Sequence, residues 1–276
     1  MQTMDFLQDA AAGMTQDQRL DFLLGYLLKE QPAYHDTQIP TQSGQKRQLL
    51  RALMNVRPPQ PIGQDFLQVQ DQYLQTARDE RGIVDGAALP PLARDPRLAL
   101  WQGDITTLRA DAIVNAANSA LLGCFHPLHG CIDNLIHTRS GVQLRLLCND
   151  LMQAQGHPEP AGRAKLTPAF NLPSRYILHT VGPIVRGRLR ERERDTLAAC
   201  YRACLELAVQ NGCQTLAFCC ISTGEFHFPN EAAAEIAVQT VSAFLHAHRP
   251  ALRVIFNVFK DQDLHIYQSL LGESKC

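Results

Sequence analysis

The chain has 276 residues, of which 45% are hydrophobic and 19% are charged, and its formal net charge at pH 7 is −1. This length suits one large domain or two modest ones, and the composition is ordinary for a soluble globular protein. The near-neutral charge argues against a nucleic-acid binder or a membrane-surface binder. A local basic cluster at residues 186–194 alternates with acidic residues and is interpreted as a solvated loop or helix start.

No apolar run reaches the length of a membrane span, and residues 1–6 lack the charged and apolar regions of a signal peptide. We therefore expect a cytoplasmic protein. The nine cysteines are unevenly spaced, which in a reducing compartment favours core thiols and a metal site over a disulfide framework. Five of them lie in apolar patterns and are expected to be small buried residues: Cys200, Cys204, Cys213, Cys219 and Cys220.

The first ninety residues predict helices. Thr15 and Gln18 have the spacing of a capping box, and the leucines that follow fall on one helical face. Two further helices are predicted over residues 41–55 and 64–78. Residues 82–96 are rich in Gly, Ala and Pro and predict a linker.

From residue 98 onward, short β-rich runs alternate with helical patterns. The predicted strands are 98–101, 112–115, 176–181, 215–221 and 253–259, and the predicted helices are 133–152, 195–210 and 230–246. This alternation predicts an α/β domain with helices on both faces of a mixed sheet. Ligands of such sheets bind at the carboxyl ends of the strands.

Polar clusters follow several of these strands. In Gly103-Asp104-Ile105-Thr106, Asp104 either accepts hydrogen bonds from an exocyclic amine or caps a turn. In Ile221-Ser-Thr-Gly224-Glu-Phe226, a Gly loop precedes a predicted helix, so its backbone N–H groups can cradle a phosphate. Phe226 either walls a ribose or a base or simply packs.

The remaining cluster begins with Asn115-Ala-Ala-Asn118, whose amides can orient hydroxyl groups or form a turn. Cys124-Phe-His126-Pro-Leu-His129-Gly-Cys131 then places four candidate metal ligands on a segment that Pro127 and Gly130 are expected to bend. Thiolate and imidazole suit Zn²⁺, and three protein ligands would leave a fourth position open. The alternatives are a chance cluster and a closed structural site completed by His126 or Cys148.

Three further polar residues lie in the predicted helix after the Cys–His segment or in a predicted strand. Asp133 starts a predicted helix, where it either caps that helix or, beside a metal, positions water or a ligand. His137 is expected to pack or to orient a neighbour. His179 is expected to be a core histidine with one hydrogen-bonded nitrogen.

Taken in order, the motifs at 103–106, 111–119, 179–183 and 221–224 resemble those of the macrodomain family, from about residue 95 to the C-terminus. The segment from Cys124 to Asn134 resembles the zinc-dependent macrodomains of bacteria and some fungi, in which it replaces a Gly-rich run. Residues 49–59 and 66–73 resemble the helical extension of that subgroup. The resemblance implies a three-layer α/β/α macrodomain with a mixed central sheet at 93–276, preceded by a helical extension at 1–92.

The same resemblance implies a hydrolase that removes mono-ADP-ribose from modified proteins and releases ADP-ribose. A lipoyl-carrier protein is one candidate substrate, no nucleic acid or membrane takes part, and a monomer is the working expectation. The alternatives are a module that reads ADP-ribose without turnover and an O-acetyl-ADP-ribose deacetylase. The implied roles are Zn²⁺ binding for Cys124, His129 and Cys131; adenine contact for Asp104 and Ile105; diphosphate contact for Ser222, Thr223, Gly224, Glu225 and Phe226; and contact with the distal ribose, as catalytic residues, for Asn118 and Asp133.

Overall fold

A computed structural model describes residues 13–248 and 250–272, so the expectation about residues 1–6 lies outside the described part. Three predicted helices are confirmed as α2 (Gln16–Glu30), α3 (Ser43–Val56) and α4 (Gln64–Arg81), with a short 3₁₀ helix η1 (Pro32–Tyr34) after α2. The predicted capping box is present, because Thr15 and Gln18 bond reciprocally at the start of α2. The three helices share an apolar cluster that is separate from the main core.

The segment predicted to be a linker is more ordered than expected. Within it, β1 (Val84–Asp85) pairs in parallel with β3 (Leu108–Arg109), and a 3₁₀ helix η2 (Gly86–Ala88) follows. A Cβ on Gly86 would lie 2.8 Å from the carbonyl oxygen of Arg109. The chain therefore approaches β3 closely here, and a two-residue strand is too short to show a sequence period. The division between residues 92 and 93 stays a prediction.

The central sheet has the order β2-β8-β7-β4-β6-β5. All neighbouring pairs are parallel except β5 with β6, which makes the sheet mixed as predicted. Five strands were predicted and the antiparallel edge strand β5 was missed. The strands are β2 (Leu98–Gln102), β4 (Ala112–Ala117), β5 (Ala164–Pro168), β6 (Tyr176–Val181), β7 (Thr215–Phe218) and β8 (Arg253–Val258).

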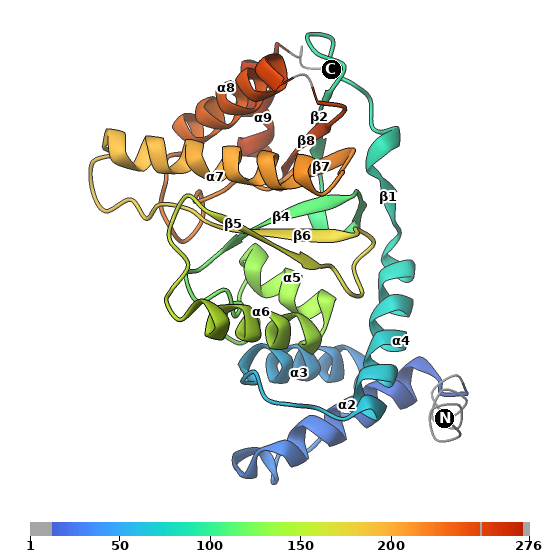
Figure 1. The fold of residues 1–276 in the computed structure, drawn as a ribbon. Coiled ribbons are helices and arrows are strands. Elements are labelled where there is room, and N and C mark those ends of the chain that lie inside the picture. Colours follow the sequence, from blue (N-terminus) through green and yellow to red (C-terminus); the bar gives the residue numbers. More distant parts are fainter. Residues whose placement is uncertain (1–12, 249, 273–276) are drawn as a thin grey trace.

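Helices cover both faces of this sheet, which gives the expected three-layer arrangement (Figure 1). On one face lie α7 (Glu191–Gln210), α8 (Asn230–His248) and α9 (Asp261–Leu271), and on the other lie α5 (Ile132–Ser140) and α6 (Val142–Gln155). Helices α2 and α3 lie beyond α5 and α6, on the side away from the sheet (Figure 1). Among the described residues, no helix combines the length and apolarity needed to cross a bilayer.

Two helical predictions are corrected. The single helix expected over 133–152 is two helices, because Gly141 between them has φ +100°. A Cβ at Gly141 would clash with the side chains of Gln143 and Gln70, the latter from α4. Helix α9 was missed, although the helical spacing of Leu264, Tyr267 and Leu271 was available in the sequence.

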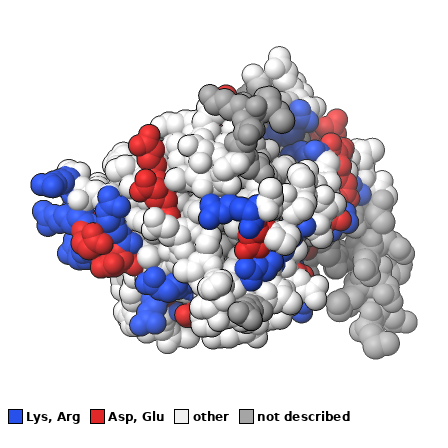
Figure 2. Space-filling model, turned by 90° about the horizontal axis from the view of Figure 1, so that it is seen from above, with Lys and Arg blue, Asp and Glu red and all other residues white. Residues whose placement is uncertain are grey.

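The basic cluster at 186–194 behaves as predicted. Arg186, Arg188, Arg190 and Arg192 are exposed in the loop before α7 and in its first turn, with Glu191 exposed between them. Figure 2 shows basic and acidic side chains mixed at the edge of the molecule where α7 begins. This mixture of signs is typical of a solvated surface.

Candidate active site

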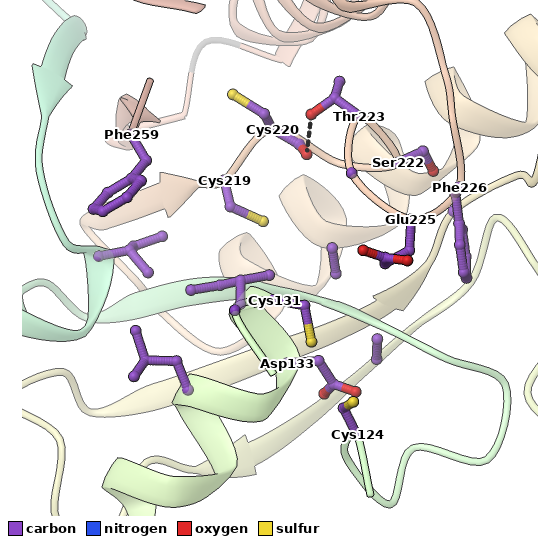
Figure 3. Close-up of a pocket in the computed structure, with 18 of the residues that line it drawn as sticks. Cys124, Cys131, Asp133, Cys219, Cys220, Ser222, Thr223, Glu225, Phe226 and Phe259 are labelled. Carbon is purple, nitrogen blue, oxygen red and sulfur yellow. Dashed lines mark hydrogen bonds between the residues drawn. The ribbon is translucent and has the colours of Figure 1, made fainter. Parts of the chain in front are cut away.

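The carboxyl ends of the parallel strands open into a pocket of about 590 Å³. Every residue that the sequence assigned to adenine, diphosphate, ribose or metal lines this one pocket. Figure 3 shows Cys124, Cys131 and Asp133 along one wall, with Glu225 and Phe226 opposite them. The convergence follows from topology, because loops after neighbouring parallel strands meet at one edge of the sheet.

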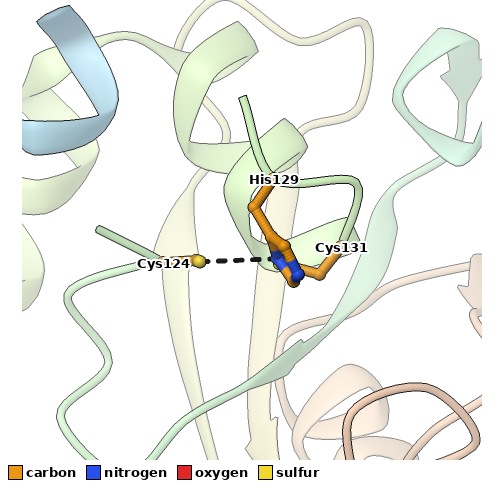
Figure 4. Close-up of side chains that lie close together, drawn as sticks. All are labelled: Cys124, His129 and Cys131. Carbon is orange, nitrogen blue, oxygen red and sulfur yellow. Dashed lines mark hydrogen bonds between the residues drawn. The ribbon is translucent and has the colours of Figure 1, made fainter. Parts of the chain in front are cut away.

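Three candidate ligands come together on residues 124–131, here called the metal loop. The ligand atoms of Cys124, His129 and Cys131 all lie within 4.8 Å of one another. Sγ of Cys124 lies 3.6 Å from Nδ1 of His129 (Figure 4). Two such atoms bound to one tetrahedral Zn²⁺ are about 3.6 Å apart, given ordinary Zn–S and Zn–N bond lengths. The donor set and its spacing therefore fit a zinc ion.

The bend of the metal loop differs from the sequence expectation. The left-handed residue is Leu128, at φ +58°, and not Gly130. The ring of His126 stacks beside His129 with centroids 5.8 Å apart, but His126 does not belong to the ligand group. Cys148 lies in α6 and belongs to a different group. Within the described part of the chain, neither residue completes a closed four-ligand site.

The second group consists of His137, Cys148 and His179. All three residues are buried, and their candidate ligand atoms lie within 4.8 Å of one another. His179 is a core histidine as predicted, but both of its ring nitrogens have hydrogen-bond partners and not only one. Nδ1 of His179 lies 3.1 Å from Nδ2 of Asn115, and Nε2 lies 2.9 Å from Oγ1 of Thr167. A metal would have to break one of these hydrogen bonds. We interpret the group as core, where burial lowers the pKa of His179 to about 3 and that of His137 well below its usual range.

Asp133 lies in the first turn of α5 beneath the metal loop, and its side chain is almost fully buried. Its Oδ1 accepts a 2.8 Å hydrogen bond from Asn115 and lies 3.6 Å from Nε2 of His137. Burial raises the pKa of Asp133 to about 6. The helix cap is Cys131, whose Sγ lies 3.4 Å from the backbone N of Asn134, so the capping reading of Asp133 is wrong. The carboxylate is thus available to the pocket.

Asn118 forms a turn, as one of its two readings predicts, and also contacts Asp133; its contact with hydroxyl groups stays a prediction. Its Nδ2 donates to the carbonyl of Gly123 at 3.0 Å and to Oδ2 of Asp133 at 3.3 Å, while its Oδ1 accepts from the backbone N–H of Ala120 at 3.0 Å. The side chain therefore shapes a turn and orients the carboxylate. Asn115 supports Asp133 from the other side, and the sequence cluster containing it was the signal for this role.

At the other end of the pocket, Asp104 caps the 3₁₀ helix η3 (Ile105–Thr107) by accepting from the backbone and hydroxyl of Thr106. Its second carboxylate oxygen pairs with Arg139 of α5. Burial of Asp104 is unfavourable to its charge, but Thr106 and Arg139 outweigh that effect and lower its pKa. Capping and pocket lining therefore coexist. Sequence reasoning missed Arg139, since nothing local links it to Asp104.

The loop after β7 bends through Ser222, which has φ +66°, and Gly182 packs against it. A Cβ on Gly182 would clash with Oγ of Ser222 and lie 2.9 Å from Cγ2 of Ile221. At the far end of the loop, Oε1 of Glu225 lies 3.4 Å from Nε2 of His129. The predicted diphosphate loop therefore touches the metal loop through a carboxylate and an imidazole.

Several pocket residues were not predicted, and one cysteine prediction is wrong. Cys220 is only half-buried and lines the pocket, while Cys200, Cys204, Cys213 and Cys219 are buried as expected. Asn257 lines the pocket from β8, and its Nδ2 donates to the carbonyl of Gly103 at 2.9 Å. The other unpredicted lining residues include Phe259, Lys260 and Asp263.

Comparison with known proteins places this site in a family. The Macro domain family matches residues 114–237. A protein-ADP-ribose hydrolase of Treponema medium is 53% identical over 94% of this chain and 100% of its own length. A protein of the same name from Staphylococcus aureus strain Mu50 is 45% identical over 92% of this chain and 95% of its own length.

Solved structures agree with these relatives. The Trypanosoma brucei macrodomain in complex with ADP-ribose has a TM-score of 0.62 and 30% identity, over 80% of this chain and 95% of that one. The Oceanobacillus iheyensis macrodomain with ADP has a TM-score of 0.59 and 37% identity, over 63% of this chain and 90% of that one. By sequence along nearly its whole length and by the architecture of its sheet and pocket, the chain belongs to the macrodomain family.

Proposed function

We propose that this protein hydrolyses the bond between ADP-ribose and a modified protein, with Zn²⁺ held by Cys124, His129 and Cys131. The observation that carries the proposal is the meeting of these three side chains and Asp133 in one pocket. Relatives that share most of the chain carry the name protein-ADP-ribose hydrolase. A pocket that only read ADP-ribose would not need a carboxylate beside an incomplete set of metal ligands.

We assign different lining residues of the pocket to the different pieces of ADP-ribose. Asp104 and the backbone at Ile105 lie at the end proposed for adenine. The loop from Ser222 to Phe226 precedes α8, and its backbone is proposed to wrap the diphosphate. Asn118 and Asp133 are proposed to face the distal ribose. Binding at the remote diphosphate fixes the reacting carbon, which lowers the entropic part of the barrier.

Without a cation, the Cys131 thiol of the metal loop is held in its neutral form. Burial raises the pKa of the Cys131 thiol to about 12, and the nearby Cys124 adds to the increase. A dication between the two sulfurs would offset both effects. When bound, Zn²⁺ supplies Lewis acidity toward a ribose hydroxyl or a water molecule. Three protein ligands leave room for such an oxygen.

Asp133 is proposed to orient the attacking water and to accept its proton. The geometry supports this role, because Asn115 and Asn118 hold the carboxylate from two sides while it still lines the pocket. A general base of this kind contributes about 10²–10⁴-fold to a rate. The bond broken joins C1″ of the distal ribose to an oxygen of the protein side chain, and water supplies the new oxygen on C1″.

The test uses mono-ADP-ribosylated protein and measures released ADP-ribose. The wild-type chain should release ADP-ribose. Asp133→Ala should bind ADP-ribose, but its release rate should be lower than that of wild type by about 10²-fold or more. Binding without release by the wild type would establish a reader module instead. Release of acetate from O-acetyl-ADP-ribose without action on protein would establish the deacetylase. Normal turnover by Asp133→Ala would remove the role given to that residue.

The metal is tested separately. Cys131→Ala should lose turnover while circular dichroism shows an unchanged fold, although the change removes the cap of α5 together with the ligand. Full turnover after chelation of the wild type would make the zinc structural. Comparing a mono-ADP-ribosylated lipoyl-carrier protein with an unrelated modified protein in the same assay tests the substrate that the resemblance suggests.

A further inference from the structure

Helix α3, far from the pocket in sequence, contacts the metal loop directly. Nη2 of Arg51 donates a 2.7 Å hydrogen bond to the carbonyl oxygen of His129 and a 2.9 Å hydrogen bond to Oδ1 of Asn134. One guanidinium nitrogen thus joins α3 to a candidate zinc ligand and to the first turn of α5. Such charge-assisted hydrogen bonds are stronger than neutral ones.

Asn134 extends this contact to the two cysteines. It is fully buried, and its Nδ2 donates to the carbonyls of Cys124 at 3.3 Å and His126 at 3.0 Å. Its backbone N lies 3.4 Å from Sγ of Cys131. A flipped amide would direct an oxygen at two carbonyls and NH₂ at a guanidinium. Arg51 therefore fixes the orientation in which Asn134 holds the loop.

A second residue of α3 holds the strained point of the loop. Leu128 has φ +58°, a left-handed conformation that leucine rarely adopts. Its backbone N–H donates a 3.0 Å hydrogen bond to Oδ1 of Asn55, which is 1% exposed. Nδ2 of Asn55 is in turn bonded to Oγ1 of Thr138 at 2.8 Å. Strained backbone persists where its surroundings hold it, and here α3 holds the residue before His129.

Arg145 of α6 connects the end of α3 to the same region. Its Nε donates to the carbonyl of Leu122 at 2.6 Å, and its Nη1 donates to the carbonyls of Met54 at 3.0 Å and Arg57 at 2.5 Å. The guanidinium also lies 4.2 Å from the ring centre of Phe125. The segment from 122 to 129 is therefore held in place by side chains of three helices, α3, α5 and α6.

We infer that α3 is a working part of the metal site, in which Arg51 and Asn55 are positioning residues that set His129 for metal binding. The inference rests on the proposed function for the identity of the metal. Neither residue lines the pocket, whereas every residue proposed to contact ADP-ribose does. A change in α3 should therefore alter metal affinity without altering the contacts made to ADP-ribose.

The test compares Arg51→Met with Lys46→Met. Both variants replace a cation of α3 with methionine, but Lys46 pairs with Asp21, 2.5 Å away, and not with the metal loop. Competition with a colorimetric chelator gives the dissociation constant for Zn²⁺, and calorimetry on metal-free protein gives the affinity for ADP-ribose. Arg51→Met should weaken zinc binding by about 10–100-fold, as loss of a ligand's outer partner does elsewhere. The zinc affinity of Lys46→Met should stay within about twofold of wild type. Both variants should also bind ADP-ribose with an affinity within about twofold of wild type.

Circular dichroism in chelator shows whether each variant folds. Arg51→Lys decides the question if Arg51→Met does not fold. Its side chain is one bond shorter, which leaves the ammonium farther from the two acceptors that Nη2 reaches, so zinc binding should weaken by about fivefold or more. Wild-type zinc affinity in the folded variant would overturn the inference and leave the proposed function standing. A wild-type chain that binds no zinc would overturn the proposed metal and the inference together.

Discussion

Nδ2 of Asn115 donates a 2.8 Å hydrogen bond to Oδ1 of Asp133, and both side chains are buried. Asn115 comes from β4 and Asp133 from the first turn of α5. The two residues therefore lie on either side of the metal loop in the sequence, and the bond joins them. It fixes the carboxylate beneath the three candidate ligands. The pair thus orients the carboxylate at the end of the pocket proposed for the reaction.

Replacing Asn115 with Ala should reduce turnover by about 10–100-fold while ADP-ribose still binds, because a freed carboxylate no longer aims at one point. Unfolding should also become easier by about 1–3 kcal/mol, since buried partners lose a hydrogen bond. Release kinetics and urea unfolding measure the two effects. Asn211→Ala, at an exposed position after α7, is the matched control. Unchanged turnover in a folded Asn115→Ala would show that this hydrogen bond does not contribute to catalysis.

Replacing Gly182 with Ala should weaken ADP-ribose binding by about tenfold, because the new Cβ displaces the loop that carries Ser222. Zinc content after saturation with Zn²⁺ should stay at the wild-type level, since the displaced loop carries Glu225 but none of the three ligands. Calorimetry with ADP-ribose and metal analysis measure these quantities. Gly25→Ala, where a Cβ meets nothing within 4 Å, is the control. Wild-type affinity in Gly182→Ala would show that this loop does not need the close approach.

Glu225→Ala should lower zinc affinity by up to about tenfold. Oε1 of Glu225 lies 3.4 Å from Nε2 of His129, while Nδ1 faces Cys124, and a carboxylate on the outer nitrogen raises the basicity of a histidine ligand. The side chain of Glu225 is 69% exposed, so solvent screens the effect and a small change is expected. Chelator competition measures it, with the exposed Glu231→Ala as control. Equal zinc affinities in the two variants would count against this carboxylate–imidazole contact.

The free energy of unfolding should decrease as the pH is lowered, because His179 is buried in its neutral form. Burial lowers its pKa from 6.5 to about 3, so below pH 6.5 the unfolded chain binds a proton that the folded chain does not. This residue should therefore remove about 1.4 kcal/mol of unfolding free energy for each pH unit below 6.5 until its folded pKa is reached. Urea unfolding in chelator at a series of pH values measures the slope. His179→Gln should have a slope shallower by that amount, and an equal slope would show that His179 titrates normally.

Much of the fold and site was predictable because the signals are local. The leucine spacing in α2, the alternation of strands and helices after residue 98, and the Cys–His segment are each visible within short windows. Parallel topology then brings the separate motifs to one edge of the sheet. For this reason, residues as distant in sequence as Asp104 and Phe226 could be assigned to one pocket.

Contacts that depend on how distant elements pack were not predictable. Arg51 and His129 are 78 residues apart, and no local pattern links an arginine of α3 to a carbonyl of the metal loop. The close approach of the Gln70 side chain, from α4, to the break at Gly141 is likewise a long-range contact. Short or polar strands such as β1 and β5 carry too little periodic signal to be recognised.

The central claim is that turnover depends on a metal held by Cys124, His129 and Cys131. Its most direct test is to titrate Zn²⁺ into metal-free protein and to measure both bound zinc and the rate of ADP-ribose release from mono-ADP-ribosylated protein. The rate should rise in proportion to bound zinc, level off at about one equivalent, and stay near zero in Cys131→Ala. A metal-free chain that releases ADP-ribose at the full rate would contradict the claim.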